Sequence, residues 1–162
     1  MKLLSTLKIS LAAFGLMLGA VTFTANAQSD KVKTSMQALV AEANKLGAPR
    51  AEGDNLYFGT TKINGDYTVV DSIKTKHGGT ATLFIKKGNS FIRVSTNVMK
   101  GAERAVGTPL DPNGPAIAAN RQGNAYYGIV DILGKLFDTG YEPIKTAKGE
   151  VIGIYYVGYL ME

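Results

Sequence analysis

The polar residues best suited to binding a small molecule lie in one segment, Arg93-Val94-Ser95-Thr96-Asn97-Val98. Side chains of a β-strand alternate between its two sides, so Arg93, Ser95 and Asn97 would face one way. Both valines, together with Thr96, would face the other way, towards a core. A guanidinium is a planar fork of N–H donors that fits a carboxylate bidentately, and the pairing strengthens where water is excluded. The alternation therefore predicts a strand whose polar side binds an anion.

Two other interpretations of Arg93 are open at this point. Its side chain could be solvated at the sheet surface, or it could pair with an acidic residue inside the protein, such as Asp131. Asp131 has two interpretations of its own, because it would either hold Arg93 in place or select a ligand that carries an amine, such as an amino acid. An unusual polar residue indicates a functional site only statistically.

The segment Gly101–Pro115 is rich in glycine and proline and has no regular hydrophobic period. Long ordered loops often carry function, so we expect this one to fold over the sheet and bring Arg104 to the ligand. The alternative is that Arg104 is a surface arginine in a weak ion pair.

Three residues on later strands would line such a cavity with hydroxyl groups, two of them on aromatic rings: Tyr126, Thr139 and Tyr141. Thr139 and Tyr141 share one face of their strand. Tyrosines in strands are more often core or sheet-surface residues than ligand contacts, and both interpretations are kept.

Motifs for catalysis are absent from the sequence. There is no Gly-x-Ser-x-Gly elbow, no phosphate-binding glycine loop and no recognisable pair of carboxylates. Cysteine is absent and His77 is the only histidine, which argues against a metal site. We therefore expect no enzyme activity, no metal and no cofactor.

Hydrophobic periodicity predicts an α+β protein in which a long amphipathic helix packs on a five- or six-stranded antiparallel sheet. Short strands joined by tight turns favour the antiparallel arrangement, since parallel strands need crossover helices. The expected helices are Asp30–Leu46, Val69–Lys76 and a single turn at Ala116–Asn120, and the expected strands are Leu56–Phe58, Thr80–Lys86, Ser90–Val98, Ala125–Ile132, Leu136–Ile144 and Val151–Leu160.

The first 27 residues have the layout of a secretory signal peptide, with a basic start, an apolar run and small residues before Ala27. A retained membrane anchor is the alternative, but the apolar run of about 15 residues is shorter than the roughly 20 that a spanning helix needs. Removing residues 1–27 from the 162-residue chain leaves 135, enough for one domain, and the loss of Lys2 and Lys8 lowers the formal net charge from +5 to +3. This mild, scattered charge is not typical of a nucleic-acid binder.

The order of several motifs resembles the Cache family of extracytoplasmic sensor domains, in particular the fused Cache-3/Cache-2 class found in methyl-accepting chemotaxis receptors. The matching stretches run through nearly all of residues 28–162: Gly78-Gly79-Thr80-Ala81-Thr82-Leu83-Phe84, Arg93-Val94-Ser95-Thr96-Asn97-Val98, Arg104-Ala105-Val106-Gly107-Thr108, Tyr126-Tyr127-Gly128, Ile132-Leu133-Gly134, Tyr141-Glu142-Pro143-Ile144, Gly149-Glu150-Val151-Ile152-Gly153 and Tyr156-Val157-Gly158. The resemblance implies a PAS-like fold with the ligand pocket on the sheet face opposite the long helix. It also implies that the strands of Arg93, Tyr126 and Tyr141 line that pocket.

Receptors of this class continue into a second membrane helix, whereas this chain ends at Glu162. We therefore expect a stand-alone periplasmic sensing domain that acts through a separate membrane chemoreceptor or sensor kinase, with a homodimer left open. The expected ligand is a short-chain carboxylate held by Arg93, oriented by Ser95, Asn97 and Thr96, and covered by Arg104. The alternative function is a ligand-free module for protein–protein contacts in a signalling or chemotaxis system.

Overall fold

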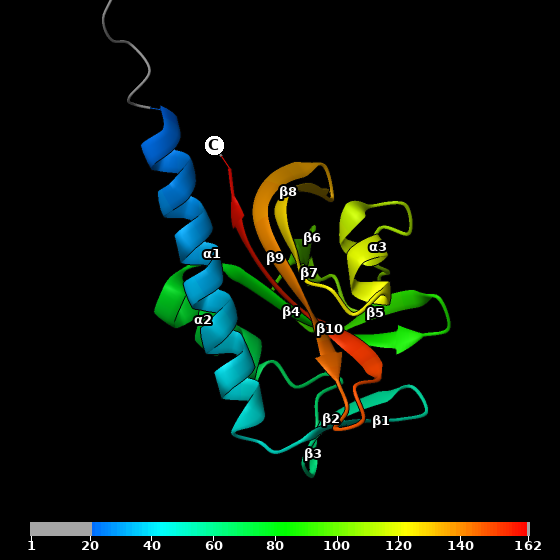
Figure 1. The fold of residues 1–162 in the computed structure, drawn as a ribbon. Helices are drawn as coiled ribbons and strands as arrows, with labels where there is room; N and C mark the ends of the chain where they lie inside the picture. The colour runs from blue at the N-terminus through cyan, green and yellow to red at the C-terminus, as the bar shows by residue number, and fades with distance from the viewer. Residues whose placement is uncertain (1–20, 162) are drawn as a thin grey trace, which may run out of the picture.

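The computed structural model describes residues 21–161, and their side chains from Asp30 onward. A five-stranded antiparallel sheet forms the centre, with the long helix α1 (Val21–Asn44) and the shorter α2 (Thr68–His77) on one face and α3 (Pro115–Arg121) on the other (Figure 1). None of the helices in the described part is both long enough and apolar enough to cross a membrane.

The central sheet has the strand order β5-β4-β10-β9-β8, and every neighbouring pair is antiparallel. Two smaller sheets flank it, of order β1-β2-β3 and β6-β7. The strands are β1 (Pro49–Glu52), β2 (Asn55–Phe58), β3 (Thr61–Lys62), β4 (Thr80–Lys87), β5 (Ser90–Thr96), β6 (Met99–Lys100), β7 (Glu103–Arg104), β8 (Tyr126–Ile132), β9 (Lys135–Lys145) and β10 (Val151–Leu160).

Alternation along β10 divides the buried residues into two clusters, one on each face of the sheet. Val157 and Tyr155 join the cluster under α1 and α2, which is mostly aliphatic. Ile154 and Tyr156 join the cluster under α3, which contains two phenylalanines of the β4–β5 hairpin, Phe84 and Phe91. The second cluster is the one next to the functional site described below.

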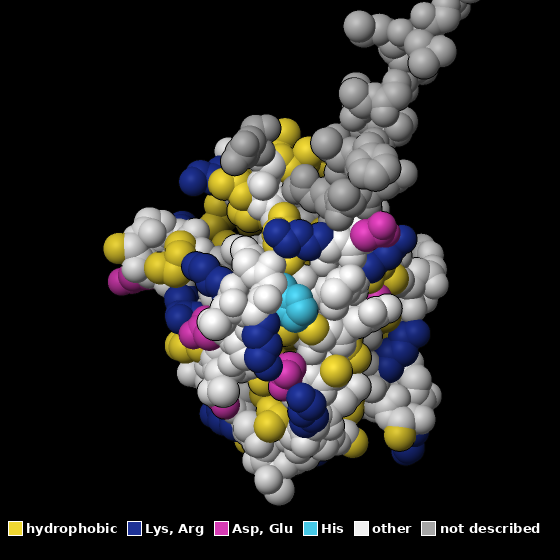
Figure 2. Space-filling view, turned by 90° about the vertical axis from the view of Figure 1, so that its left-hand side faces the viewer, with side chains coloured by type: hydrophobic (Ala, Val, Ile, Leu, Met, Phe, Trp, Pro, Cys, Tyr) yellow, Lys and Arg dark blue, Asp and Glu magenta, His cyan; other side chains and the backbone are white. Residues whose placement is uncertain are grey.

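The long helix lies close to the sheet because small residues face it. A Cβ atom added to Gly140 of β9 would come within 3.0 Å of Val32 on α1, a contact too tight without adjustment. The hydroxyl groups of Ser35 on α1 and Tyr159 on β10 are hydrogen-bonded at 2.6 Å. At the outer side of the helices Glu42 pairs with Lys45 and Lys76, and basic and acidic side chains are interspersed over this face of the molecule (Figure 2). The close approach at Gly140 and the Ser35–Tyr159 hydrogen bond hold α1 against β9 and β10, and the Glu42–Lys76 pair joins it to α2.

The predicted α+β class, the antiparallel sheet and the long N-terminal helix on one face are confirmed, and the sheet has five strands. The helix α1 begins at Val21, before the predicted start at Asp30, and continues past Ala27, where cleavage was predicted. Residues 1–20 of the predicted signal peptide lie outside the described residues. The short strands β1, β3, β6 and β7 were not predicted, because two to four residues carry too little periodicity to be recognised.

Candidate functional site

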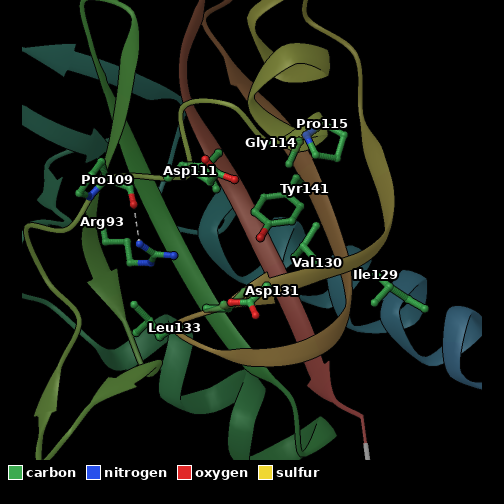
Figure 3. Close-up of a pocket in the computed structure, with 13 residues that line it drawn as sticks. Arg93, Pro109, Asp111, Gly114, Pro115, Ile129, Val130, Asp131, Leu133 and Tyr141 are labelled. Carbon is green, nitrogen blue, oxygen red and sulfur yellow. Dashed lines mark hydrogen bonds between the residues drawn. The ribbon is translucent and has the colours of Figure 1, made fainter.

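A cavity of about 390 Å³ lies on the α3 face of the sheet. This volume is at the lower end of the range of small-molecule sites. Its walls come from β5, from the segment that leads into α3, from β8 with the following turn, and from β9 (Figure 3). The lining residues are Arg93, Pro109, Leu110, Asp111, Gly114, Pro115, Ala116, Ile129, Val130, Asp131, Ile132, Leu133 and Tyr141.

The segment before α3 reaches the cavity because it pairs with the free edge of β5. The backbone N–H of Arg93 donates to the carbonyl of Thr108 at 3.0 Å, and the N–H of Leu110 donates to the carbonyl of Phe91 at 2.8 Å. This edge pairing places the carbonyl of Pro109 beside the Arg93 side chain, where it accepts a hydrogen bond from Nη1 at 2.9 Å. The chain before α3 is therefore fixed as a wall of the cavity.

Arg93 is 6 % exposed and lines the cavity. Its side-chain hydrogen bonds within residues 21–161 all come from Nη1, to the Oγ1 atom of Thr108 and to the carbonyl of Pro109. The Nε atom is buried and has no hydrogen-bond partner in the described part of the chain. The guanidinium lies 5.0 Å from the centre of the Phe84 ring. Its remaining donors thus have no acceptor among these residues.

No carboxylate in residues 30–161 forms an ion pair with Arg93 at 4.0 Å or less, so the open alternative of a pair with Asp131 is not what the structure shows. Burial lowers the pKa of the Arg93 guanidinium from its usual value. Arginine nevertheless stays protonated in proteins, and a charge removed from water without a partner is unfavourable. A bound anion would supply the missing partner.

Tyr141 stands opposite Arg93 and is only 1 % exposed. Its ring packs between those of Tyr126 and Tyr156, with centroid distances of 6.3 and 5.0 Å, and its hydroxyl points into the cavity (Figure 3). Burial raises the pKa of the Tyr141 hydroxyl well above its usual value. The group therefore remains a neutral O–H donor at physiological pH, in reach of whatever occupies the cavity.

Asp111, Asp131 and one strained leucine complete the list of lining residues. Asp111 and Asp131 are both exposed, and each accepts a backbone N–H of its own turn, from Asn113 at 3.0 Å and from Gly134 at 2.8 Å. Leu133 has φ of +54°, a left-handed conformation that leucine rarely adopts. The positive φ turns this 49 % exposed side chain towards the lining of the cavity.

The alternation predicted for the segment 93–98 is wrong, because β5 contains a bulge. Leu83 of β4 pairs with Ser95 but Phe84 pairs with Arg93, so Val94 is an extra residue. An extra residue reverses the facing of every side chain that follows it. Arg93 therefore keeps the α3 face, while Ser95 turns to the face covered by α1 and α2.

The polar side chains after the bulge form hydrogen bonds within the protein and do not line the cavity. Ser95 donates to the carbonyl of Asp66 at 2.6 Å. Asn97 donates from Nδ2 to the carbonyl of Val70 on α2 and accepts the backbone N–H of Ala81. Thr96 lies on the α3 face, but its Oγ1 atom is 2.6 Å from that of Thr82, and it does not line the cavity.

Arg104 does not close over the cavity. Its Nη1 and Nη2 atoms donate to the two carboxylate oxygens of Asp71 on α2, at 2.8 and 2.9 Å, and Nη1 also donates to the carbonyl of Thr96. The guanidinium stacks 4.2 Å from the centre of the Tyr67 ring. Hydrogen bonding to Asp71 raises the pKa of Arg104. This arginine joins the β6–β7 hairpin to α2, which corrects the expected role.

Of the remaining expected site residues, Asp131 and Tyr141 line the cavity, and Tyr126 and Thr139 stand behind it. Tyr126 supports the Tyr141 ring, and Thr139 is fully buried and donates to the carbonyl of Gly128 at 2.6 Å. Asp111 was not anticipated, although it lies in the segment expected to cover the sheet. No group of three or more His, Cys, Asp or Glu side chains that could hold a metal was found in the described part.

Comparison with known protein families identifies the family of this chain. The family model of the Cache 3/Cache 2 fusion domain matches residues 13–162. The chain belongs to this family. Domains of the Cache family are extracytoplasmic sensor domains that bind small molecules, so this Cache domain is a sensing domain in that general sense.

Two matches among solved structures share little sequence with this Cache domain. The sensor domain of DcuS from E. coli is 15 % identical, with a TM-score of 0.46 and coverage of 85 % of this chain and 88 % of that chain. The Nlh2 GAF domain from A. aeolicus in an inactive state is also 15 % identical, with a TM-score of 0.47 and coverage of 81 % and 83 %. No curated protein matched the sequence.

Proposed function

We propose that this Cache domain binds a small organic anion, a short-chain carboxylate or a related acid, in the cavity beside Arg93. The carboxylate accepts hydrogen bonds from the free donors of the guanidinium and from the hydroxyl of Tyr141. The chain is exported by a signal peptide, residues 1–27, and works as a single periplasmic domain, residues 28–162. Its bound state is read by a separate membrane chemoreceptor or sensor kinase, and the domain catalyses no reaction.

The observation that carries this proposal is the buried Arg93 side chain, which faces a cavity and has no acidic partner among residues 30–161. Leaving a charge buried and unpaired lowers the stability of the folded protein. A carboxylate ligand offsets that cost on binding, and the planar guanidinium matches its geometry. The unliganded protein is thus already arranged for an anion.

The proposal is tested by thermal denaturation of the purified protein with a panel of carboxylate-bearing compounds: short-chain acids, hydroxy acids, dicarboxylates and amino acids. A ligand at a hundred times its Kd stabilises the protein by about 2.7 kcal/mol. We expect a melting shift with at least one member of the panel and no shift with the same compound in Arg93→Met. The apolar side chain fills the same space, so this variant remains folded.

Arg50→Met is the matched control, because Arg50 lies on β1 away from the cavity and pairs with Glu52. It should keep the full ligand-dependent shift. A melting temperature that no compound of the panel changes, together with concentration-dependent self-association, would contradict ligand binding and support a module for protein–protein contacts. An equal shift in Arg93→Met would also contradict the proposed site.

A further inference from the structure

The two edges of the central sheet differ in how they are covered. The outer edge of β5 is paired with the segment before α3, through hydrogen bonds from the N–H groups of Arg93 and Leu110. The outer edge of β8 has no further strand beside it, and no backbone hydrogen bond from the described part of the chain reaches it. An uncovered edge strand is a template for pairing with another chain.

The peptide groups of Tyr127, Ile129 and Asp131 point outward from this edge. Asp131 lies opposite Leu136 of β9, and the carbonyl of Leu136 accepts the N–H of Met161, which follows β10. The N–H and the carbonyl of one strand residue point to the same side, so those of Leu136 point to β10 and those of Asp131 point away from β9. Alternate residues share this direction, which adds Ile129 and Tyr127 to the open edge.

Strand β8 lacks the features that usually protect an edge. It contains no lysine, arginine or proline, and its register with β9 is continuous, without a bulge. The side chain of Ile129 is 55 % exposed, and that of Leu136, on the same face of β9, is 54 % exposed. Natural edge strands commonly carry charges, prolines or bulges that prevent pairing. The edge of β8 is therefore open to a partner strand.

A second copy of this chain fits the edge in one register. When two β8 strands pair antiparallel about Ile129, this residue lies opposite its own copy, and Tyr127 lies opposite Asp131 of the second copy. Each outward N–H and carbonyl of the three residues then has a partner. A pairing about Val130 would instead place Tyr127 against Leu133, beyond the end of the strand. Only the register about Ile129 pairs all three outward residues among themselves.

We infer that the protein forms a two-fold symmetric dimer in which the β8 strands of two copies pair antiparallel about Ile129. The two five-stranded sheets then become one continuous sheet. Charge also favours a second copy, because Asp131 is the one charged residue of β8 and this register places it opposite the neutral Tyr127. Like charges directly opposite each other would be destabilising. The dimer does not involve Arg93, which lies on β5 at the other edge.

The first test is sedimentation velocity of the purified protein. A single strand pair covers less than the roughly 1,600 Å² of a standard interface, so we expect a reversible dimer with a Kd of roughly 10 to 100 μM. Measured from about tenfold below to about tenfold above this range, the wild-type protein should change from monomer to dimer.

Ile129→Lys should raise the Kd of the dimer at least about tenfold, because it places two ammonium groups opposite each other. The side chain is half exposed, so the variant should keep the wild-type circular dichroism. Leu46→Lys is the matched control. Leu46 is also an exposed aliphatic residue, but it lies in the turn after α1, beside Gly59. This variant should dimerise like the wild-type protein.

The second test is disulfide cross-linking, which reports the register because the chain contains no cysteine. Opposite residues of a hydrogen-bonded antiparallel pair have Cα atoms about 5.5 Å apart, within the roughly 4.4 to 6.8 Å that a disulfide spans. Ile129→Cys should therefore form a linked dimer on mild oxidation. Leu136→Cys is the matched control, since this similarly exposed residue of β9 would lie three strand spacings, about 14 Å or more, from its own copy.

A mixture of Tyr127→Cys and Asp131→Cys chains gives a further check of the register. The two variants should link to each other, and neither should link to itself. Equal cross-linking of Ile129→Cys and Leu136→Cys would refute the register.

A wild-type protein that remains monomeric over the whole concentration range would overturn the dimer. Dimerisation of Ile129→Lys as strong as that of wild type would assign the association to another surface and would also overturn it. Arg93→Met should dimerise like the wild-type protein. Failure of the ligand proposal therefore leaves the dimer standing, and loss of the dimer leaves the ligand proposal standing.

Discussion

Arg93 and Arg104 are eleven positions apart, and the structure uses them in opposite ways. Arg104 makes a bidentate contact with Asp71, stacks on Tyr67 and bonds the backbone of Thr96, so its charge is fully engaged. Arg93 is more deeply buried, yet it has no carboxylate within reach among the described residues and leaves Nε without a partner. Arg104 stabilises the contact of the β6–β7 hairpin with α2. Arg93, a buried charge without an acidic partner among the described residues, is expected to lower the free energy of unfolding.

The two faces of the sheet show the same contrast. The face under α1 and α2 is filled by a cluster of mainly aliphatic residues. The face under α3 has an aromatic cluster beside an open cavity with a buried cation. A domain that only had to fold would gain nothing from the second arrangement, since replacing a buried charge by apolar groups is often neutral or stabilising. This difference is the reason why we propose the ligand site on the α3 face.

The largest stability effect should come from the engaged arginine. Arg104→Met removes the hydrogen bonds to Asp71 and the stacking on Tyr67, and we expect the free energy of unfolding to fall by about 1 to 2 kcal/mol. Urea denaturation measures this loss, and a double-mutant cycle with Asp71→Asn isolates the pair. Ligand affinity should stay at the wild-type value. A drop in the ligand affinity of Arg104→Met as large as that of Arg93→Met would contradict the claim that only Arg93 binds the ligand.

The next effect concerns the strained turn at the cavity. Leu133 and Gly134 form the two-residue loop between β8 and β9, and both have positive φ. Asparagine followed by glycine is favoured in such a turn, so Leu133→Asn should raise the free energy of unfolding by about 1 kcal/mol. Loss of the apolar wall should weaken ligand binding in the same variant, as titration would show. A variant that is no more stable than wild type would argue against stored strain at this turn.

The smallest effect should come from a buried acid on the filled face. Asp138 is 8 % exposed and pairs across the sheet with Tyr159, and burial raises the pKa of its carboxyl above the usual 3.8. A folded-state pKa above the unfolded value means that stability is lost as the pH rises through it. Asp138→Asn should therefore stabilise the protein at pH 7 but not below about pH 3.8. Chemical denaturation across this pH range checks the sign, and a gain confined to acidic pH would contradict it.

Much of the fold could be predicted because its elements are long and regular. The strand β10 coincides with its predicted range, β8 differs by one residue at its start, and β9 and α2 differ by one residue at each end. Their hydrophobic periodicity and flanking glycines are local signals. The predicted start of α1 was later than the observed one, because the preceding residues had been interpreted as the end of a signal peptide.

The candidate site was predicted less completely, and a single residue explains much of the error. The bulge at Val94 has no glycine or proline to mark it, so simple alternation placed Ser95 and Asn97 beside Arg93. Asp111 was overlooked because nothing in an irregular segment indicates which of its residues meets β8. Arg104 was assigned to the ligand because its partner Asp71 lies on α2, 33 positions earlier.

The amino-acid sequence by itself determined the elements, their antiparallel arrangement and the presence of an arginine suited to an acid, because each depends on residues close together in the chain. Only the tertiary structure decided that Arg104 pairs with Asp71 while Arg93 has no acidic partner among the described residues, and that the segment before α3 forms a wall of the Arg93 cavity. Those facts depend on register and on long-range packing, where one bulged residue redirects a strand and a distant carboxylate neutralises a charge.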